Sequence, residues 1–179
     1  MNIFHLDKPG KIEVPTGESR YLIRQNEPGE QSYVFHLRQP DCQTQILALV
    51  ETAGESALLL KIDVIHHAPA TRSKTLVKTL ACDASHPRFE GLIRVEPAAR
   101  GSESRLEHHS LLVGDQAKSR TLPSLEILTD DVKCSHAATV RTLSELDLFY
   151  PRSRGIGVPE TRNMLIEAFL ADVAECRSQ

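Results

Sequence analysis

Cys134 and His136 are the residues of this 179-residue chain whose types and spacing best suit metal chemistry. On a regular strand both side chains point to one face, while Ser135 between them points to the other. A thiolate and an imidazole are suitable ligands for iron or zinc, but a closed site uses roughly four ligands. Further ligands would have to come from elsewhere or from a second chain. The alternative is core packing, because Val132 precedes the pair on the same face.

Two histidine pairs, His66–His67 and His108–His109, lie beside apolar runs. In each pair one imidazole would face inward and the other outward on a strand. Stacking of these histidines from neighbouring coils would form an imidazole row, which is a conceivable path for a metal ion. Solvated histidines at strand ends are the commoner outcome, so the metal path is the less favoured interpretation.

Three carboxylates, Glu126, Asp130 and Asp131, lie close to Cys134 in the sequence. Paired carboxylates about 5 to 9 Å apart perform acid–base catalysis in glycosidases. No aromatic residues that would serve as sugar platforms accompany them, and the aspartates are more typical of a turn. A solenoid carbohydrate enzyme is therefore the least favoured function.

Residues 114–119 contain a Lys-Ser pair but lack the second glycine that a phosphate-binding loop needs directly before its lysine. Hydrolysis of ATP is therefore expected in another protein. We expect the chain itself not to be an enzyme.

Residues 32–140 contain short segments typical of β-strands, separated by turn residues and without a helical period. Within 58–65, for example, leucine, isoleucine and valine alternate with other residues, as expected for a two-faced strand. Evenly spaced strands fit a sandwich, a barrel or a solenoid, and the pattern alone does not decide among them. The expected segments are 33–37, 43–50, 57–65, 76–81, 92–95, 106–113 and one from 124 running on to 134.

Both ends of the chain differ from this middle region. Residues 1–31 are expected to form a cap or hairpin over the first coil. In the C-terminal segment, 141–179, Ser144 is expected to cap a short helix that ends at Pro151. A final helix is expected from Pro159, with an apolar stripe that needs a surface to pack against. The stripe consists of Met164, Leu165, Ala168, Phe169 and Val173.

The composition fits a protein that stays where it is made. The net charge is -3, from 21 basic and 24 acidic residues, which does not suggest nucleic acid or a membrane surface as the main partner. The start of the chain does not read as a signal peptide, and no apolar run approaches the roughly 18 residues of a membrane span. The four cysteines are far apart, without a CxxC motif, which favours a reduced, cytoplasmic location.

A long run of residues resembles the C-terminal core of the SufB/SufD family of iron–sulfur cluster assembly scaffolds. It comprises 125–136 (LEILTDDVKCSH), 138–140 (ATV), 148–150 (LFY) and 153–156 (SRGI). Upstream segments, among them 66–69 (HHAP) and 89–91 (FEG), occur in the family's order. The likeness spans roughly residues 55–170, and the Cys-Ser-His at 134–136 resembles the SufD branch.

This resemblance implies a right-handed parallel β-helix over 32–140 with a C-terminal helical segment, serving as a scaffold that handles a transient iron–sulfur cluster. It implies that Cys134 and His136 lie at a subunit interface as cluster or metal ligands. The implied partners are a SufC-like ABC-type ATPase and either a SufB/SufD-like subunit or a second copy of this chain. A structural adaptor that handles no metal remains the alternative. The expected partner-binding residues are Phe149, Tyr150, Arg154, Met164, Leu165 and Phe169.

Overall fold

The alternation of apolar side chains places one face of each central strand in a shared interior. We describe residues 1–177 of the chain from a computed structural model. In strand β6 (Leu58–His66) the expected residues Leu58, Leu60, Ile62 and Val64 are all buried, and the residues between them are half-buried. The period of two seen in the sequence therefore corresponds to an inner and an outer face.

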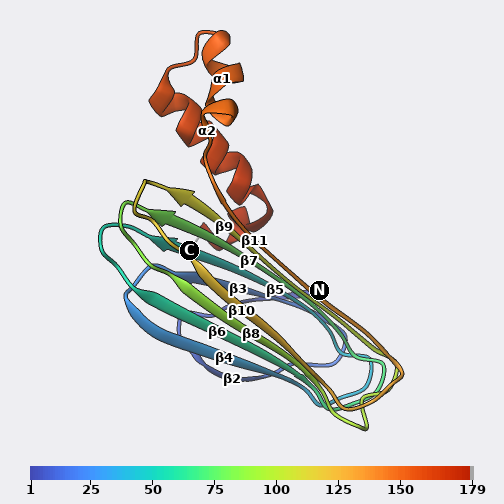
Figure 1. The fold of residues 1–179 in the computed structure, drawn as a ribbon. Helices are drawn as coiled ribbons and strands as arrows, with labels where there is room; N and C mark the ends of the chain where they lie inside the picture. The colour runs from blue at the N-terminus through green and yellow to red at the C-terminus, as the bar shows by residue number, and fades with distance from the viewer. Residues whose placement is uncertain (178–179) are drawn as a thin grey trace.

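All paired strands are parallel and form the two sheets of a β-solenoid (Figure 1). Sheet A has the order β1-β3-β5-β7-β9-β11, and sheet B has the order β10-β8-β6-β4-β2. Odd-numbered and even-numbered strands thus alternate between the two sheets as the chain winds. The other strands are β1 (Asn2–His5), β2 (Gly10–Glu13), β3 (Glu18–Gln25), β4 (Gly29–Leu37), β5 (Gln43–Thr52), β7 (Arg72–Cys82), β8 (Arg88–Val95), β9 (Ser102–Val113), β10 (Arg120–Ile127) and β11 (Val132–Thr142). The predicted parallel β-helix is confirmed.

The interior between the sheets is mostly aliphatic, with a few rings. Tyr33, Phe35 and Phe89 are the largest fully buried side chains. Gly91 on β8 is needed because a Cβ built there would lie 2.6 Å from Leu106 Cδ1 across the core. Polar columns also run through the interior, and in sheet A the column Ser19, Thr44, Ser73 and Ser104 lies in register on successive strands.

The N-terminal region extends the solenoid and does not form the expected hairpin. β1 pairs in parallel with β3, and β2 pairs in parallel with β4. Phe4 stacks on the buried ring of Tyr21 with 5.0 Å between ring centroids. A hairpin would have required antiparallel pairing of consecutive strands, whereas the winding chain places consecutive strands in opposite sheets.

The single segment expected from residue 124 to 134 is in fact two strands in different sheets. β10 pairs with β8 in sheet B, and β11 pairs with β9 in sheet A. The turn between them includes Asp131, whose carbonyl accepts a hydrogen bond of 2.7 Å from the Gly101 amide. The aspartates thus lie in a turn, as the sequence suggested.

The C-terminal segment begins with helix α1 (Glu145–Ser153), capped as expected by Ser144. The Ser144 hydroxyl accepts a hydrogen bond from the Asp147 amide, and the Asp147 carboxylate accepts one from the Ser144 amide. Pro151 lies inside this helix, so the expectation that it ends the helix is wrong.

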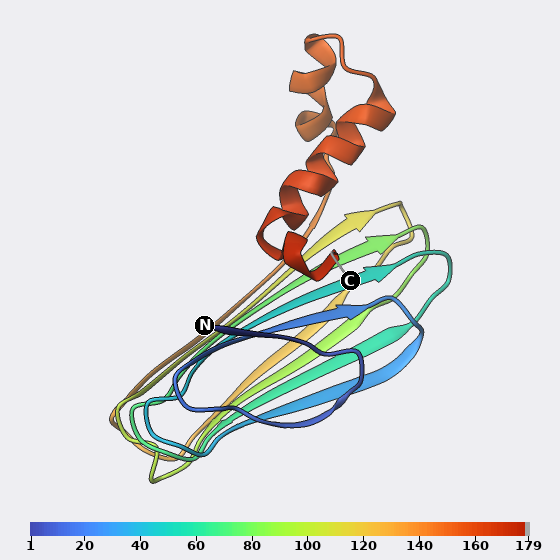
Figure 2. The same ribbon diagram turned by 180° about the vertical axis from the view of Figure 1, so that it is seen from behind.

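Helix α2 (Val158–Leu170) and the 3-10 segment η1 (Ala171–Arg177) return to the outer face of sheet A (Figure 2). Phe169, Leu170, Val173 and Cys176 are buried there, in a cluster with leucines of β3, β5, β7 and β9. The chain's own solenoid therefore covers the C-terminal part of the expected apolar stripe. No helix of residues 1–177 is long and apolar enough to cross a membrane.

Candidate metal and interface site

Cys134 and His136 lie on β11, an edge strand of sheet A that pairs with β9 on one side and with no other strand of residues 1–177. Cys134 is in register with Ser104 of β9, and His136 is in register with Leu106. Ser104 and Leu106 are buried in the interior. Both candidate side chains are therefore on the inward-facing side of the sheet, as their spacing predicted.

The two candidates differ in exposure. Cys134 is half-buried and packs against the main hydrophobic core, whereas His136 is exposed and has no hydrogen-bond partner among residues 1–177. Burial raises the pKa of the Cys134 thiol, and a hydrogen bond with the Ser104 backbone partly opposes this effect. The thiol is thus protonated near neutral pH, and binding of a metal ion would have to displace that proton.

Apolar side chains surround the pair, and no further coil of residues 1–177 covers them. On β10, Leu125 and Ile127 are in register with the buried Ile93 and Val95, so they also belong to the inner face. They are nevertheless 39% and 37% exposed. We call this surface the open end; its inward-facing residues are Thr121, Pro123, Leu125 and Ile127 of β10 and Val132, Cys134, His136, Ala138 and Val140 of β11.

The open end does not hold a complete metal site by itself. Within the described part of the chain, no group of three or more His, Cys, Asp or Glu side chains is placed to bind one metal ion. Cys134 and His136 supply two suitable donors, and a third or fourth ligand would come from outside residues 1–177.

The less favoured interpretation, a row of stacked imidazoles from His66–His67 and His108–His109, is wrong. The favoured interpretation, solvated histidines at strand ends, is also wrong for His66 and His108. His66 is fully buried in sheet B, with Nδ1 2.8 Å from Thr71 Oγ1 and Nε2 3.0 Å from Ser73 Oγ. His108 is fully buried in sheet A, between Thr79 Oγ1 at 2.8 Å and Thr121 Oγ1 at 2.7 Å. The two imidazoles belong to separate hydroxyl networks.

The outward-facing histidines do not join such a row either. His67 faces His36, with 2.9 Å between Nε2 and Nδ1, while His109 Nδ1 is 2.8 Å from Thr139 Oγ1.

Burial lowers the pKa of His66 to about 4 and that of His108 to about 3. These two inner histidines are therefore neutral members of the core.

The carboxylates considered for acid–base catalysis do not converge. Glu126 is in register with Arg94 on the outer side of sheet B and forms an ion pair of 3.4 Å with it. Asp131 lies 3.9 Å from Arg100 in the turn. Both carboxylates are thus ion-paired, which does not favour the carbohydrate-enzyme interpretation.

The helical segment, which stands away from the sheets in Figure 1, also carries exposed large apolar side chains. Phe149 is 67% and Tyr150 65% exposed, and the Arg154 guanidinium lies 5.4 Å from the centroid of the Tyr150 ring. Leu146 belongs to the same segment and is the most exposed large apolar residue, at 81%. We call this set, completed by the exposed Met164, the helical patch.

Two of the residues expected to bind a partner lie elsewhere. Phe169 is only 9% exposed, and its ring lies below the Lys78 ammonium, 4.7 Å from the centroid. Leu165 is half-buried. Phe169 therefore belongs to the attachment of the helical segment to sheet A.

Sequence reasoning missed Leu146, Leu125 and Ile127. Leu146 precedes Phe149 and Tyr150 by three and four residues, a helical spacing that marks one face. Leu125 and Ile127 alternate with polar residues, so the pattern predicted their inward direction. It did not indicate that the strand would be the last of its sheet.

The stacked parallel coils place the chain in the class of solenoid repeat proteins, in which neighbouring coils share one continuous core. Comparison with known proteins gives the family. The family described as "SUF system FeS cluster assembly, SufBD core domain" matches residues 30–169. The chain belongs to this family.

Individual relatives agree with that assignment. The chain is 40% identical over 110 residues to the iron–sulfur cluster assembly protein SufD of Escherichia coli, covering 62% of this chain and 26% of SufD. It is 34% identical over 167 residues to the chloroplastic protein ABCI7 of Arabidopsis thaliana, covering 92% of this chain and 33% of the relative. A SufBD family protein of Mycobacterium bovis is 36% identical over 112 residues, covering 63% of this chain and 13% of that protein. The chain thus spans a third or less of these relatives.

Proposed function

We propose that this chain is a scaffold subunit for iron–sulfur cluster assembly in a SUF-type system, and that it is not itself an enzyme. The observation that carries the proposal is the position of Cys134 and His136 on the inward face of β11, at the open end. Thiolate and imidazole are both iron ligands, and the iron–sulfur cluster is the cargo of the scaffold. Membership of the SufBD family supports the same assignment.

The missing half of the site is proposed to come from a second solenoid. The open end presents apolar side chains such as Leu125 and Val140. It also presents the outer edges of β10 and β11, which pair with no further strand of residues 1–177. Such edges and patches are normally covered. A second copy of this chain or a SufB/SufD-like subunit that binds end to end would bury them and add ligands beside Cys134.

The energy source is proposed to be a separate SufC-like ATPase that binds the helical patch. Leu146, Phe149 and Tyr150 expose large apolar surfaces on a short helix that stands away from the sheets. Aromatic side chains of this kind contribute much of the binding energy at protein interfaces. In this arrangement the ATPase would act on the helical segment, and the cluster would be held at the open end.

A structural adaptor without metal handling is the second candidate. It is favoured by the packing of Cys134 against the core and by the raised pKa of its thiol. The two candidates differ in a measurable way, because an adaptor would bind partners equally well when its sulfur is removed.

Anaerobic reconstitution with iron and sulfide separates the two functions. The purified assembly is compared with Cys134→Ser and His136→Ala variants, and with Cys82→Ser as a control thiol that lies at the far end of β7. We expect both site variants to lose most of the bound iron while thermal stability and partner binding stay unchanged. Equal iron in the wild type, both site variants and the control would establish the adaptor.

Capture of a SufC-like ATPase tests the helical patch separately. Phe149→Ala and Tyr150→Ala should each weaken capture by about thirtyfold or more, since truncation of an interface hot spot costs about 2 kcal/mol or more. Phe4→Ala, in the first coil, is the matched control, because its ring is also partly exposed. Unchanged capture by both patch variants would contradict this assignment.

A further inference from the structure

The outer face of sheet A has two halves with different coverage. The half toward the carboxyl ends of the strands is covered by η1, whose acidic side chains pair with cations of the sheet. Asp172 is 3.2 Å from Lys78 Nζ, and Glu175 is 2.8 Å from Arg20 Nη1. An acidic segment that crosses the strands of this sheet is therefore already present in the molecule.

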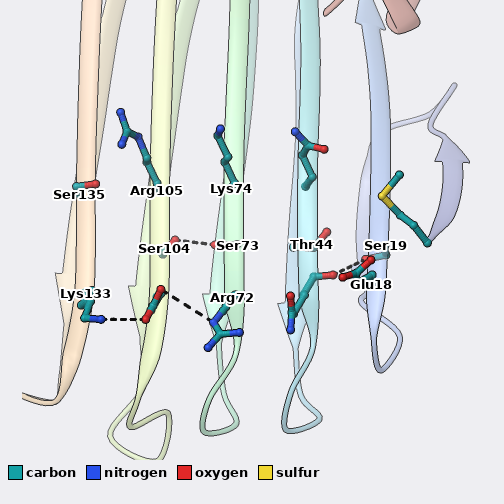
Figure 3. A pocket seen from close by; sticks show the side chains of 14 residues that line it. Glu18, Ser19, Thr44, Arg72, Ser73, Lys74, Ser104, Arg105, Lys133 and Ser135 are labelled. Carbon is teal, nitrogen blue, oxygen red and sulfur yellow. Dashed lines mark hydrogen bonds and ion pairs between the residues drawn. The ribbon is translucent and has the colours of Figure 1, made fainter. Parts of the chain in front are cut away.

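The other half carries a groove that no element of residues 1–177 fills. It has a volume of about 460 Å³ and crosses the strands between two outward-facing rows, as Figure 3 shows from β3 to β11. We call it the transverse groove. One row is Glu18, Gln43, Arg72, Glu103 and Lys133, the other continues from Arg20 through Gln45, Lys74, Arg105 and Ser135, and the column Ser19, Thr44, Ser73 and Ser104 lies between them.

The charges along the transverse groove do not balance. Four cationic side chains line it, against the two carboxylates Glu18 and Glu103. Arg72 and Lys133 share Glu103, at 4.0 and 3.2 Å. This local positive excess contrasts with the net charge of -3 for the whole chain.

The remaining two cations differ in their partners, and neither pairs with a carboxylate that lines the groove. Arg105 pairs with Glu107 of its own strand, and Lys74 has no ion-pair or hydrogen-bond partner within the described range. Both project from the row that begins with Arg20. That row already binds a carboxylate of η1 at its first position.

We propose that the transverse groove binds an extended acidic segment of a partner protein, with carboxylates spaced to meet Lys74 and Arg105. On the covered half of this face, carboxylates of η1 pair with Lys78 and Arg20. On the uncovered half, carboxylates of the partner segment would pair with Lys74 and Arg105 in the same way. The two glutamates within the groove oppose a continuous polyphosphate chain, whereas a peptide can place neutral residues opposite them. The groove reaches Lys133 and Ser135, which flank Cys134, so the segment would end beside β11. The proposal needs no iron and does not rest on the proposed cluster chemistry.

Binding of a fluorescent peptide in which glutamate alternates with serine tests the proposal by anisotropy. We expect saturable binding that weakens as salt is added, and loss of binding when glutamine replaces every glutamate. In the Lys74→Gln/Arg105→Gln variant, binding should weaken about three- to tenfold, the effect of two exposed ion pairs. The matched control is Lys11→Gln/Lys118→Gln, which removes two exposed cations outside sheet A.

Carbodiimide cross-linking locates the peptide independently of affinity. A peptide glutamate should couple to Lys74 or Lys133, and not to Lys11. Three results would overturn the proposal: no saturable binding by the wild type, equal weakening in the control variant, or tighter binding of oligothymidylate of matched charge. The last result would identify the groove as a nucleic-acid surface. Circular dichroism of both variants confirms that they are folded.

Discussion

Strands β9 and β11 are neighbours in one sheet, in register along their whole length, yet their inward faces have opposite surroundings. On β9, Ser104, Leu106 and His108 are at most 4% exposed. On β11, Cys134 is half-buried and His136 is exposed, although both point to the same side. In sheet A a further strand follows β9, whereas no strand formed by residues 1–177 follows β11.

The contrast shows that the candidate site is created by the end of the stack and not by a special local conformation. A Cys and a His at these positions of an inner coil would be core residues, like His108. At the final coil the same inward direction leaves them accessible to a partner. The chemistry available to a residue in a solenoid therefore depends on the position of its coil in the stack as much as on the type of residue.

The largest expected effect compares the same truncation in the two surroundings. Leu106→Ala should lower the free energy of unfolding by about 2–5 kcal/mol, because the cavity left over Gly91 cannot be filled by neighbours. Leu125→Ala at the open end should cost less than about 1 kcal/mol. Denaturant titration at low protein concentration measures both. Equal losses would mean that the open end is packed like the interior.

A smaller effect is expected from acid, through the buried histidines. The folded-state pKa is about 4 for His66 and about 3 for His108, both below the ordinary value of 6.5. Their neutral forms thus stabilise the fold above pH 6.5, and this stability is lost as the pH falls from 6.5 toward the folded-state values. Each can contribute up to about 1.4 kcal/mol per pH unit.

The comparison with β11 supplies the control for this pH effect. Free energies of unfolding measured between about pH 7 and pH 5.5, above the carboxylate range, should decrease with acid. His108→Asn should flatten the decrease, whereas Ala138→Asn, at the aligned position of β11, should leave it unchanged because it neither adds nor removes a titratable group. An equal slope in the wild type and the His108→Asn variant would contradict the buried neutral assignment.

The sequence predicted the repeating part of the molecule better than its ends. The strict alternation at Leu58, Leu60, Ile62 and Val64 is a local pattern. The sequence therefore predicted the central strands and the faces that they turn inward. The hairpin over the first coil and the helix end at Pro151 failed, because pairing partners and helix continuation depend on tertiary contacts. The same reason explains Phe169, whose place in an apolar stripe did not reveal that sheet A covers it.

Candidate site residues followed the same rule. The common face of Cys134 and His136 was predictable from their spacing. The even spacing of His66 from its apolar neighbours in the same way predicted that its side chain shares their face. Among the hydroxyl partners of the inner histidines, Thr79 is 29 residues from His108, a separation that no local pattern encodes. Thr71 is only five residues after His66, but the two side chains meet because the chain turns between β6 and β7. Family resemblance supplied the importance of Cys134, but only the strand order shows that its coil is the last described one.

The smallest effect, a difference in thiol reactivity, examines the candidate site directly. Cys42 and Cys176 are fully buried, and burial raises the pKa of Cys176 to about 11. Cys134 also has a raised thiol pKa, but it is half-buried at the open end. Iodoacetamide should therefore label Cys134 about tenfold faster than Cys42 or Cys176 in the native protein, with a rate that rises with pH as thiolate forms.

Half-buried Cys82 provides the comparison that separates the site from mere accessibility, since its thiol pKa is also raised by burial. Cys82 lies at the end of β7, outside the open end, so its labelling should not depend on association or on iron. Labelling of Cys134 should slow when protein concentration favours end-to-end association, and slow further when iron is bound. If both cysteines are protected to the same extent, protection reflects general stabilisation of the fold. Slowing confined to Cys134 would support the proposed role of the open end in subunit association and iron binding.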